Sequence, residues 1–231
     1  MIQSIIKKRM QTIAKRRGLF ILRMVIPAIA VIPLMALPTN VFFVASVITI
    51  LTLIFGIFGV GQALGEDRAK GALQTIAVAP IRPVYVVWGE IIANTLIMTV
   101  QFLPLLAGIW LLSPSGAGEA IGAHSFAFLS TALFASTVGV LLVPFVAEMR
   151  TLLFASSMFA ILTASGVLVP LRSATQLAIA KWIPATYLYQ GTTLLFGKES
   201  IVSTGEILLL SIFPTLVILA GVELISKRII R

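Results

Sequence analysis

The 231-residue chain contains no cysteine, which excludes disulfides, thiolate metal sites and thiol catalysis. It contains one histidine, His124, which we place in a surface loop beside an apolar segment. With one histidine and no cysteine, metalloprotease sites and most pairs of a nucleophile with a base cannot be built. The composition therefore argues against an enzyme.

Charged residues are also scarce, at 11% of the chain, whereas 59% of residues are hydrophobic. Soluble domains are typically about half apolar and about a quarter charged, so this composition indicates a membrane protein. The net charge is +9, from 17 basic and 8 acidic residues. Because the basic residues fall between apolar segments and not on one solvated face, no nucleic-acid partner is expected.

A nucleotide-binding phosphate loop is missing as well. Residues 191–198, GTTLLFGK, come nearest to one. They have one residue too many between the glycines, and Glu199 stands where Ser or Thr is needed. We therefore expect this chain to bind no cofactor.

Six apolar segments approach the roughly 20 residues that a helix needs to cross a bilayer. These predicted spans are residues 18–38, 40–64, 84–112, 125–146, 151–171 and 206–225. Residues 1–17 place apolar side chains at helical spacing among lysines and arginines, which predicts an amphipathic helix in the headgroup plane. A cleaved signal peptide is the alternative for this segment.

The basic residues predict the orientation of the spans. Thirteen of the 17 lie in residues 1–17, in residues 65–83, at Arg150 and in the C-terminal tail, whereas three lie in residues 172–203. Arg23 falls inside the first span, from which it can reach the interface. We expect a single transmembrane domain in the plasma membrane, with both termini cytoplasmic.

Residues 172–203 are then extracellular and contain several aromatic side chains. We expect short helices at the outer interface, with Trp182, Tyr187 and Tyr189 at headgroup level.

Polar side chains inside the spans are functional candidates. Glu90, Asn94 and Gln101 are four and seven residues apart, so they share one face of the third span. They either line a translocation pathway or hydrogen-bond to a neighbouring helix. The same alternatives apply to small polar residues of the second and fifth spans, Thr49, Thr52, Ser156 and Thr163.

Residues 65–83, GEDRAKGALQTIAVAPIRP, interrupt the apolar sequence with charge. The stretch resembles the cytoplasmic loop of the type-2 ABC exporter permeases, including the spacing from Gly71 to Pro80. Ala72 and Gln74 depart from that family's Thr and Glu, and Glu90 stands where many members have Lys. A segment of this chain before the last span also resembles the family's L-P…W…P-x-x-Y pattern, through Pro170, Leu171, Trp182, Pro184, Tyr187 and Leu195.

The resemblance implies an all-α polytopic fold: six transmembrane helices, an N-terminal elbow helix, a cytoplasmic coupling helix at residues 65–83 and short extracellular helices before the last span. It also implies a permease subunit that moves an amphiphilic substrate outward. The expected partners are membrane lipid, a second permease subunit as homodimer or heterodimer, and two copies of a separate ATPase subunit that binds ATP and Mg²⁺. The residues implied in ATPase coupling are Glu66, Asp67, Arg68, Lys70, Gly71, Leu73, Gln74, Ile76, Ala77, Pro80 and Arg82.

Two other classes of function stay open on the sequence. A stand-alone secondary transporter or channel should show paired ionisable residues at mid-membrane or broken, inverted-repeat spans, and neither is evident in the sequence. A membrane-embedded enzyme is the third alternative, which the missing catalytic motifs disfavour.

Overall fold

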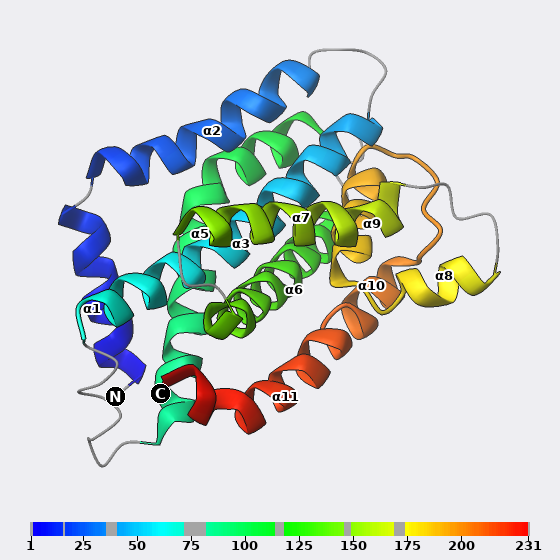
Figure 1. Cartoon of the computed structure of the whole chain (residues 1–231). Helices are drawn as coiled ribbons and strands as arrows, with labels where there is room; N and C mark the ends of the chain where they lie inside the picture. The colour runs from blue at the N-terminus through cyan, green and yellow to red at the C-terminus, as the bar shows by residue number, and fades with distance from the viewer. Residues whose placement is uncertain are drawn as a thin grey trace.

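The computed structural model describes residues 2–15, 17–35, 41–71, 82–113, 118–145, 149–168 and 174–230. Every regular element in these ranges is a helix, which confirms the all-helical prediction (Figure 1). The helices are α1 (Ile2–Lys15), α2 (Arg17–Met35), α3 (Val41–Ala69), α5 (Pro83–Leu112), α6 (Gly118–Leu142), η1 (Val143–Phe145), α7 (Met149–Leu168), α8 (Ala174–Ala180), α9 (Pro184–Leu195), α10 (Thr204–Leu210) and α11 (Phe213–Ile230).

Within the described residues, four segments are long and apolar enough to cross a membrane. They are Val41–Arg68, Pro83–Leu112, Gly118–Phe145 and Thr204–Val222. Two further apolar stretches, Phe20–Val31 in α2 and Thr151–Thr163 in α7, are shorter. The fold is therefore that of a membrane-embedded helical protein, with four candidate spans.

Helix α6 lies at the centre of the bundle, where it contacts α3, α5, α9, α10 and α11. Its crossing with α3 depends on two glycines. A Cβ on Gly139 would lie 2.4 Å from the Ile57 carbonyl oxygen, and one on Gly56 would lie 2.4 Å from the Ala135 Cβ. The missing side chains let the two backbones approach closely, as is common between membrane helices.

Helix α6 begins at Gly118, seven residues before the predicted span, so the placement of His124 in a surface loop is wrong. His124 lies within the helix and is fully buried. Its Nδ1 accepts a hydrogen bond of 3.3 Å from Trp110 Nε1 on α5. Its backbone lies directly against Gly191 of α9, whose missing side chain leaves the room for this approach.

The predicted span 206–225 is interrupted, because α10 ends at Leu210 and α11 begins at Phe213. Pro214 has no N–H to donate to the carbonyl four residues earlier, and its ring would clash with that carbonyl in a continuous helix. These two effects explain the break at this place. Ser130 of α6 donates a 2.5 Å hydrogen bond to the Ser211 carbonyl inside the break. The central helix thus donates a hydrogen bond to a buried backbone carbonyl at the interruption between the two helices.

Short helices do precede the last span, and the aromatic residues of this region differ in exposure. Trp182 is exposed, whereas Tyr187 of α9 is buried and its hydroxyl donates to the Lys181 carbonyl at 2.8 Å. Tyr187 therefore packs inside the protein and does not present its ring at the protein surface; its level in the membrane stays a prediction. Helix α9 packs against α6 and α3, so most of it belongs to the core.

Candidate functional site

Three helix segments that are distant in sequence meet around the guanidinium of Arg9. Arg9 Nε donates to Glu90 Oε2 at 2.7 Å, and its terminal nitrogen donates to Asp67 Oδ2 at 2.9 Å. Lys8 Nζ lies 3.3 Å from both oxygens of Asp67. We call Lys8, Arg9, Asp67 and Glu90 the charge cluster; it joins α1 to the end of α3 and the start of α5.

Local sequence features place each member of the charge cluster. Arg9 follows Ile5 by one helical turn, so it lies on the apolar face of α1, where Ile5 packs against Gly89. Pro83 occupies the first turn of α5, a favoured position for proline, and Glu90 follows two turns later. Because Gly89 has no side chain, α1 can approach α5 closely enough for the Arg9–Glu90 contact.

Three of the four members of the charge cluster are shielded from water. Arg9, Asp67 and Glu90 are 8%, 7% and 4% exposed, whereas the Lys8 side chain is largely accessible. Burial alone lowers the pKa of Arg9, but its hydrogen bond to Glu90 and the charges of Glu90 and Asp67 outweigh that effect and raise the pKa above its ordinary value. Arg9 is therefore a permanent buried cation held between two carboxylates, and not part of a solvated basic face.

The end of α3 shows where several of the predicted coupling residues lie. The helix continues five residues past the predicted span and ends at Ala69; the turn that follows contains Gly71, whose φ of +69° suits a residue without a side chain. Arg68, Lys70 and Arg82 are exposed, and Glu66 is half-buried with Lys70 at 3.8 Å. Asp67 faces inward to the charge cluster, so its carboxylate is not available on the surface.

The other predicted coupling residues lie outside the described part of the chain. They are Leu73, Gln74, Ile76, Ala77 and Pro80.

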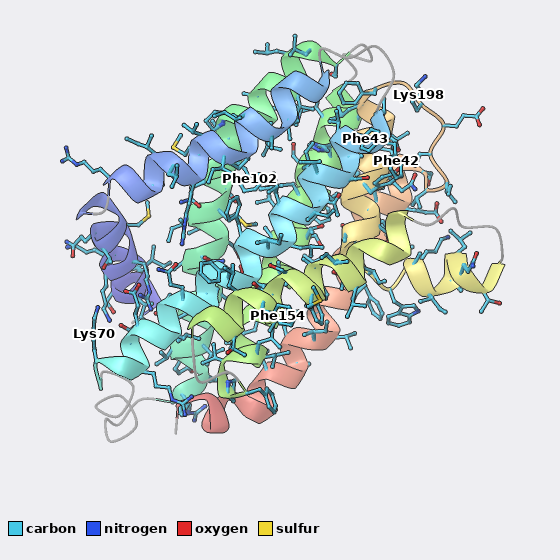
Figure 2. The ribbon with its side chains drawn as sticks, turned by 45° about the horizontal axis from the view of Figure 1, so that its top comes forward. Phe42, Phe43, Lys70, Phe102, Phe154 and Lys198 are labelled. Atoms are coloured by element: carbon cyan, nitrogen blue, oxygen red, sulfur yellow. The ribbon has the colours of Figure 1, made fainter. Side chains whose placement is uncertain are left out.

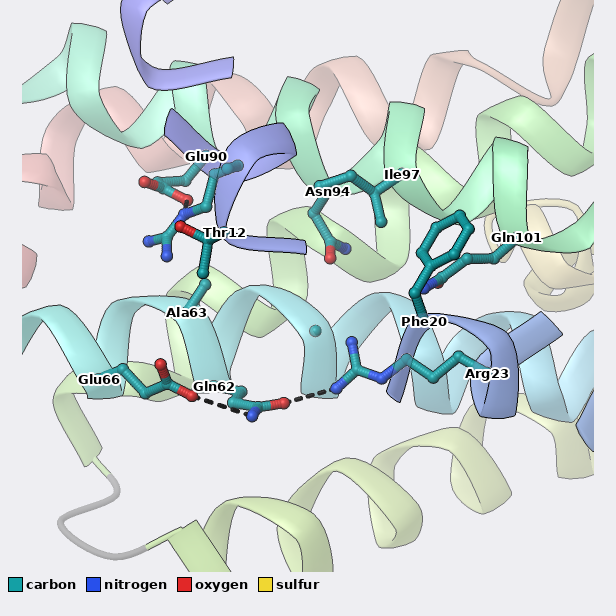
Figure 3. Close-up of a pocket in the computed structure, with 12 residues that line it drawn as sticks. Thr12, Phe20, Arg23, Gln62, Ala63, Glu66, Glu90, Asn94, Ile97 and Gln101 are labelled. Atoms are coloured by element: carbon teal, nitrogen blue, oxygen red, sulfur yellow. Dashed lines mark hydrogen bonds and ion pairs between the residues drawn. The ribbon is translucent and has the colours of Figure 1, made fainter. Parts of the chain in front are cut away.

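A cavity lies beside the charge cluster, lined by residues of α1, α2, α3 and α5 (Figure 3). It contains about 630 Å³ of empty space, part of which opens to the surroundings. Arg9, Thr12, Phe20, Arg23, Gly59, Gln62, Ala63, Glu66, Glu90, Asn94, Ile97 and Gln101 line it.

Arg23 and Glu66 are linked along one wall of this cavity through Gln62. Arg23 donates to Gln62 Oε1 at 2.5 Å, and Gln62 Nε2 donates to Glu66 Oε1 at 3.1 Å. Arg23 is half-buried and its guanidinium has a polar partner on α3; that it reaches the membrane interface stays a prediction.

The three polar residues predicted to share a face of α5 all line the cavity. Glu90 pairs with Arg9, and Asn94 donates to the Gly56 carbonyl at 3.0 Å and to Ser136 Oγ at 2.9 Å. Asn94 therefore fastens α5 to both α3 and α6. Gln101 is 4% exposed, and within the described part of the chain its amide makes no hydrogen bond.

The small polar residues on the other spans bond to their own helices. The hydroxyls of Thr49, Thr52, Ser156 and Thr163 donate to carbonyls three or four residues earlier, at 2.7–2.8 Å. None of these four residues lines the cavity. Their hydroxyls are satisfied locally, which lets them lie between packed helices.

Sequence reasoning missed Arg9, Lys8, Arg23 and Gln62 as members of a site. The signal for Arg9 was its position on the apolar face of an amphipathic helix, because a charge there needs a buried partner. No group of three or more metal-ligating side chains occurs among the residues that the structure describes.

Comparisons of the chain with protein-family models, curated proteins and solved structures found no match. The class that the structure itself defines is an all-helical, membrane-embedded protein with four candidate spans. Its distinguishing features are a buried charge cluster that joins three helices and an adjoining polar cavity.

Proposed function

We propose that the chain is the permease subunit of an ATP-driven ABC exporter, which moves an amphiphilic substrate outward when a separate ATPase subunit drives it. The observation that carries the proposal is the charged stretch at residues 65–83 in its structural setting. Both helices that flank residues 72–81, α3 and α5, are fastened at that end to α1 through Arg9. A force applied to the intervening segment would reach both helices together.

The charge cluster suits this transmission of force. Buried, hydrogen-bonded ion pairs resist separation, because breaking one leaves a charge without a partner in a poorly solvated site. When the ATPase subunits close on ATP, the segment between α3 and α5 moves, and α1 follows as part of the same rigid body. The shorter apolar helices α2 and α7 complete a six-span arrangement in this proposal.

The proposed orientation places residues 65–83 and both termini in the cytoplasm. Figure 2 shows Lys70 and Lys198 at opposite ends of the molecule. In Figures 1 and 2, α1 and the end of α11 lie toward the Lys70 end, whereas α8 and α9 lie toward the other. The excess of basic residues on the Lys70 side supports a cytoplasmic location for that end.

The test is reconstitution with an ATPase subunit, which the proposal predicts to be encoded in a neighbouring reading frame. The two proteins are purified together, placed in proteoliposomes, and their ATP hydrolysis is measured. The exposed residues Arg68 and Lys70 are both changed to Glu, which reverses the surface charge at the end of α3 without touching the charge cluster. We expect at least a tenfold loss of permease-dependent ATP hydrolysis, because the docking contacts are replaced by repulsion.

Lys198→Glu is the matched control, because it reverses an exposed charge at the opposite end and should leave hydrolysis unchanged. Equal activity of the Arg68→Glu, Lys70→Glu variant and the wild type would overturn the docking role. Failure of the two wild-type proteins to copurify would also count against the proposal.

A stand-alone secondary transporter is the second candidate, and one observation favours it: Glu90 is a buried carboxylate on a cavity wall. Ionisable groups inside membrane proteins often mark ion or proton routes. Substrate movement by this chain alone, driven by a proton gradient and abolished by Glu90→Gln, would select this function. Movement that requires the ATPase and ATP would exclude it.

A further inference from the structure

The cavity beside the charge cluster has the mixed polar and apolar lining of a small-molecule site. The space is partly open to the surroundings, and its lining offers hydrogen-bonding groups together with apolar surface. Eight of the twelve lining residues are polar or charged, and the apolar side chains are those of Phe20, Ala63 and Ile97. Figure 3 shows Phe20, Arg23 and Gln101 at one end of the cavity, and Glu66 and Glu90 at the other.

The charges that line the cavity balance one another. Arg9 is paired with Glu90 and with Asp67 behind the wall, and Arg23 is connected to Glu66 through Gln62. Two cationic and two anionic side chains therefore line the space. A ligand with a net charge would find no excess of opposite charge here, and it would have to leave its own hydration behind.

Gln101 shows which polar chemistry the cavity lacks. Its side chain is 4% exposed, extends toward the Phe20 end of the cavity, and makes no hydrogen bond with the described residues (Figure 3). Buried amides are nearly always hydrogen-bonded, since an unmade bond costs free energy. The side-chain amide of Gln101 has N–H donors and a carbonyl acceptor. A hydroxyl or amide group on a ligand can accept from the N–H groups and donate to the carbonyl. A phosphate or carboxylate can only accept, and an ammonium can only donate.

From this geometry we propose that the cavity binds an uncharged amphiphile, whose hydroxyl- or amide-bearing headgroup meets Gln101 and whose apolar chain lies against Phe20 and Ile97. The residues that line the site all come from four helices of one chain. Binding therefore requires neither a second subunit nor an ATPase. An experiment can thus refute this binding site without refuting the proposed function, and the reverse is also true.

The test uses the full chain in lipid nanodiscs and a photoreactive probe, octyl β-D-glucoside with a diazirine on its alkyl chain. Labelled peptides are identified by mass spectrometry. We expect saturable labelling of peptides from Arg17–Met35 and Pro83–Leu112, which unlabelled octyl glucoside suppresses. Octyl phosphate and octylammonium probes of the same design should label these peptides only without saturation.

Gln101→Leu should weaken the saturable labelling about tenfold, as expected from the loss of two hydrogen bonds of ordinary strength. It should not unfold the protein, because it removes a buried amide without a partner. Thr99→Val is the matched control: Thr99 lies on the same helix, and its hydroxyl donates to the Thr95 carbonyl at 2.8 Å. This variant should label like the wild type.

Three results would overturn the proposal. One is wild-type labelling by the glucoside probe in Gln101→Leu. Another is equal or stronger saturable labelling by the phosphate or ammonium probe. The third is the absence of saturable labelling in a chain whose thermal unfolding shows that it is folded.

Discussion

Replacing Arg9 by methionine should destabilise the protein strongly, because the substitution leaves two buried carboxylates behind. Glu90 is 4% exposed and, within the described residues, hydrogen-bonds only to Arg9. The substitution therefore removes this hydrogen bond and leaves the buried carboxylate without its ion-pair partner. Asp67 keeps Lys8 at 3.3 Å, and the exposure of that lysine makes the remaining pair weak. Breaking a buried ion pair on one side typically costs 3–5 kcal/mol, and we expect about 3 kcal/mol here, mostly from Glu90.

The assay is reversible unfolding in mixed dodecyl maltoside and sodium dodecyl sulfate micelles, followed by tryptophan fluorescence. One of the three tryptophans, Trp88, lies two residues from Glu90 and reports on this region. Lys7→Met is the matched control, because it removes an exposed cation from the same helix and should change stability by less than about 0.5 kcal/mol.

A double-mutant cycle separates the ion pair from the packing of Arg9. Adding Glu90→Gln to Arg9→Met removes the unpaired charge, so the double variant should recover about 2 kcal/mol relative to additivity. The reasoning is refuted if Arg9→Met costs no more than Lys7→Met, or if the two substitutions are additive.

Two further predictions concern the central helix. Gly139→Ala should cost about 1–3 kcal/mol in the same unfolding assay, because the new Cβ would lie 2.4 Å from the Ile57 carbonyl oxygen; Gly122→Ala on the same helix meets nothing within 4 Å and should be neutral or stabilising. Ser130→Ala should cost about 1–2 kcal/mol by leaving the carbonyl at the α10–α11 break unsatisfied, whereas Ser125→Ala removes only a bond within its own helix and should cost less. Equal effects within either pair would contradict the packing described for α6.

The sequence predicted the existence and approximate position of most helices, because long apolar segments are a strong local signal. The shared face of Glu90, Asn94 and Gln101 followed from helical spacing, and the structure places all three on one cavity. The break before α11 had a local signal in Pro214, which the apolar character of its neighbours outweighed in the prediction.

The charge cluster could not be predicted, because its pairs join residues 58 and 81 positions apart. Charges in residues 1–17 and 65–83 look equally suited to a solvated surface when each segment is read alone. Whether a charge faces inward depends on which helix packs beside it. The burial of His124 could not be predicted for the same reason, because it results from contacts with α5 and α9.

The most direct test of ATP-driven export uses the absence of cysteine from the chain. Arg68→Cys then introduces a single thiol at an exposed position on the end of α3, and Lys198→Cys places one at the opposite end. With the copurified ATPase and a short thiol-to-amine crosslinker, the account predicts a crosslink from position 68, altered by ATP, and none from position 198. If position 68 instead reacts with an impermeant maleimide added outside intact cells and gives no crosslink to the ATPase, the account is contradicted.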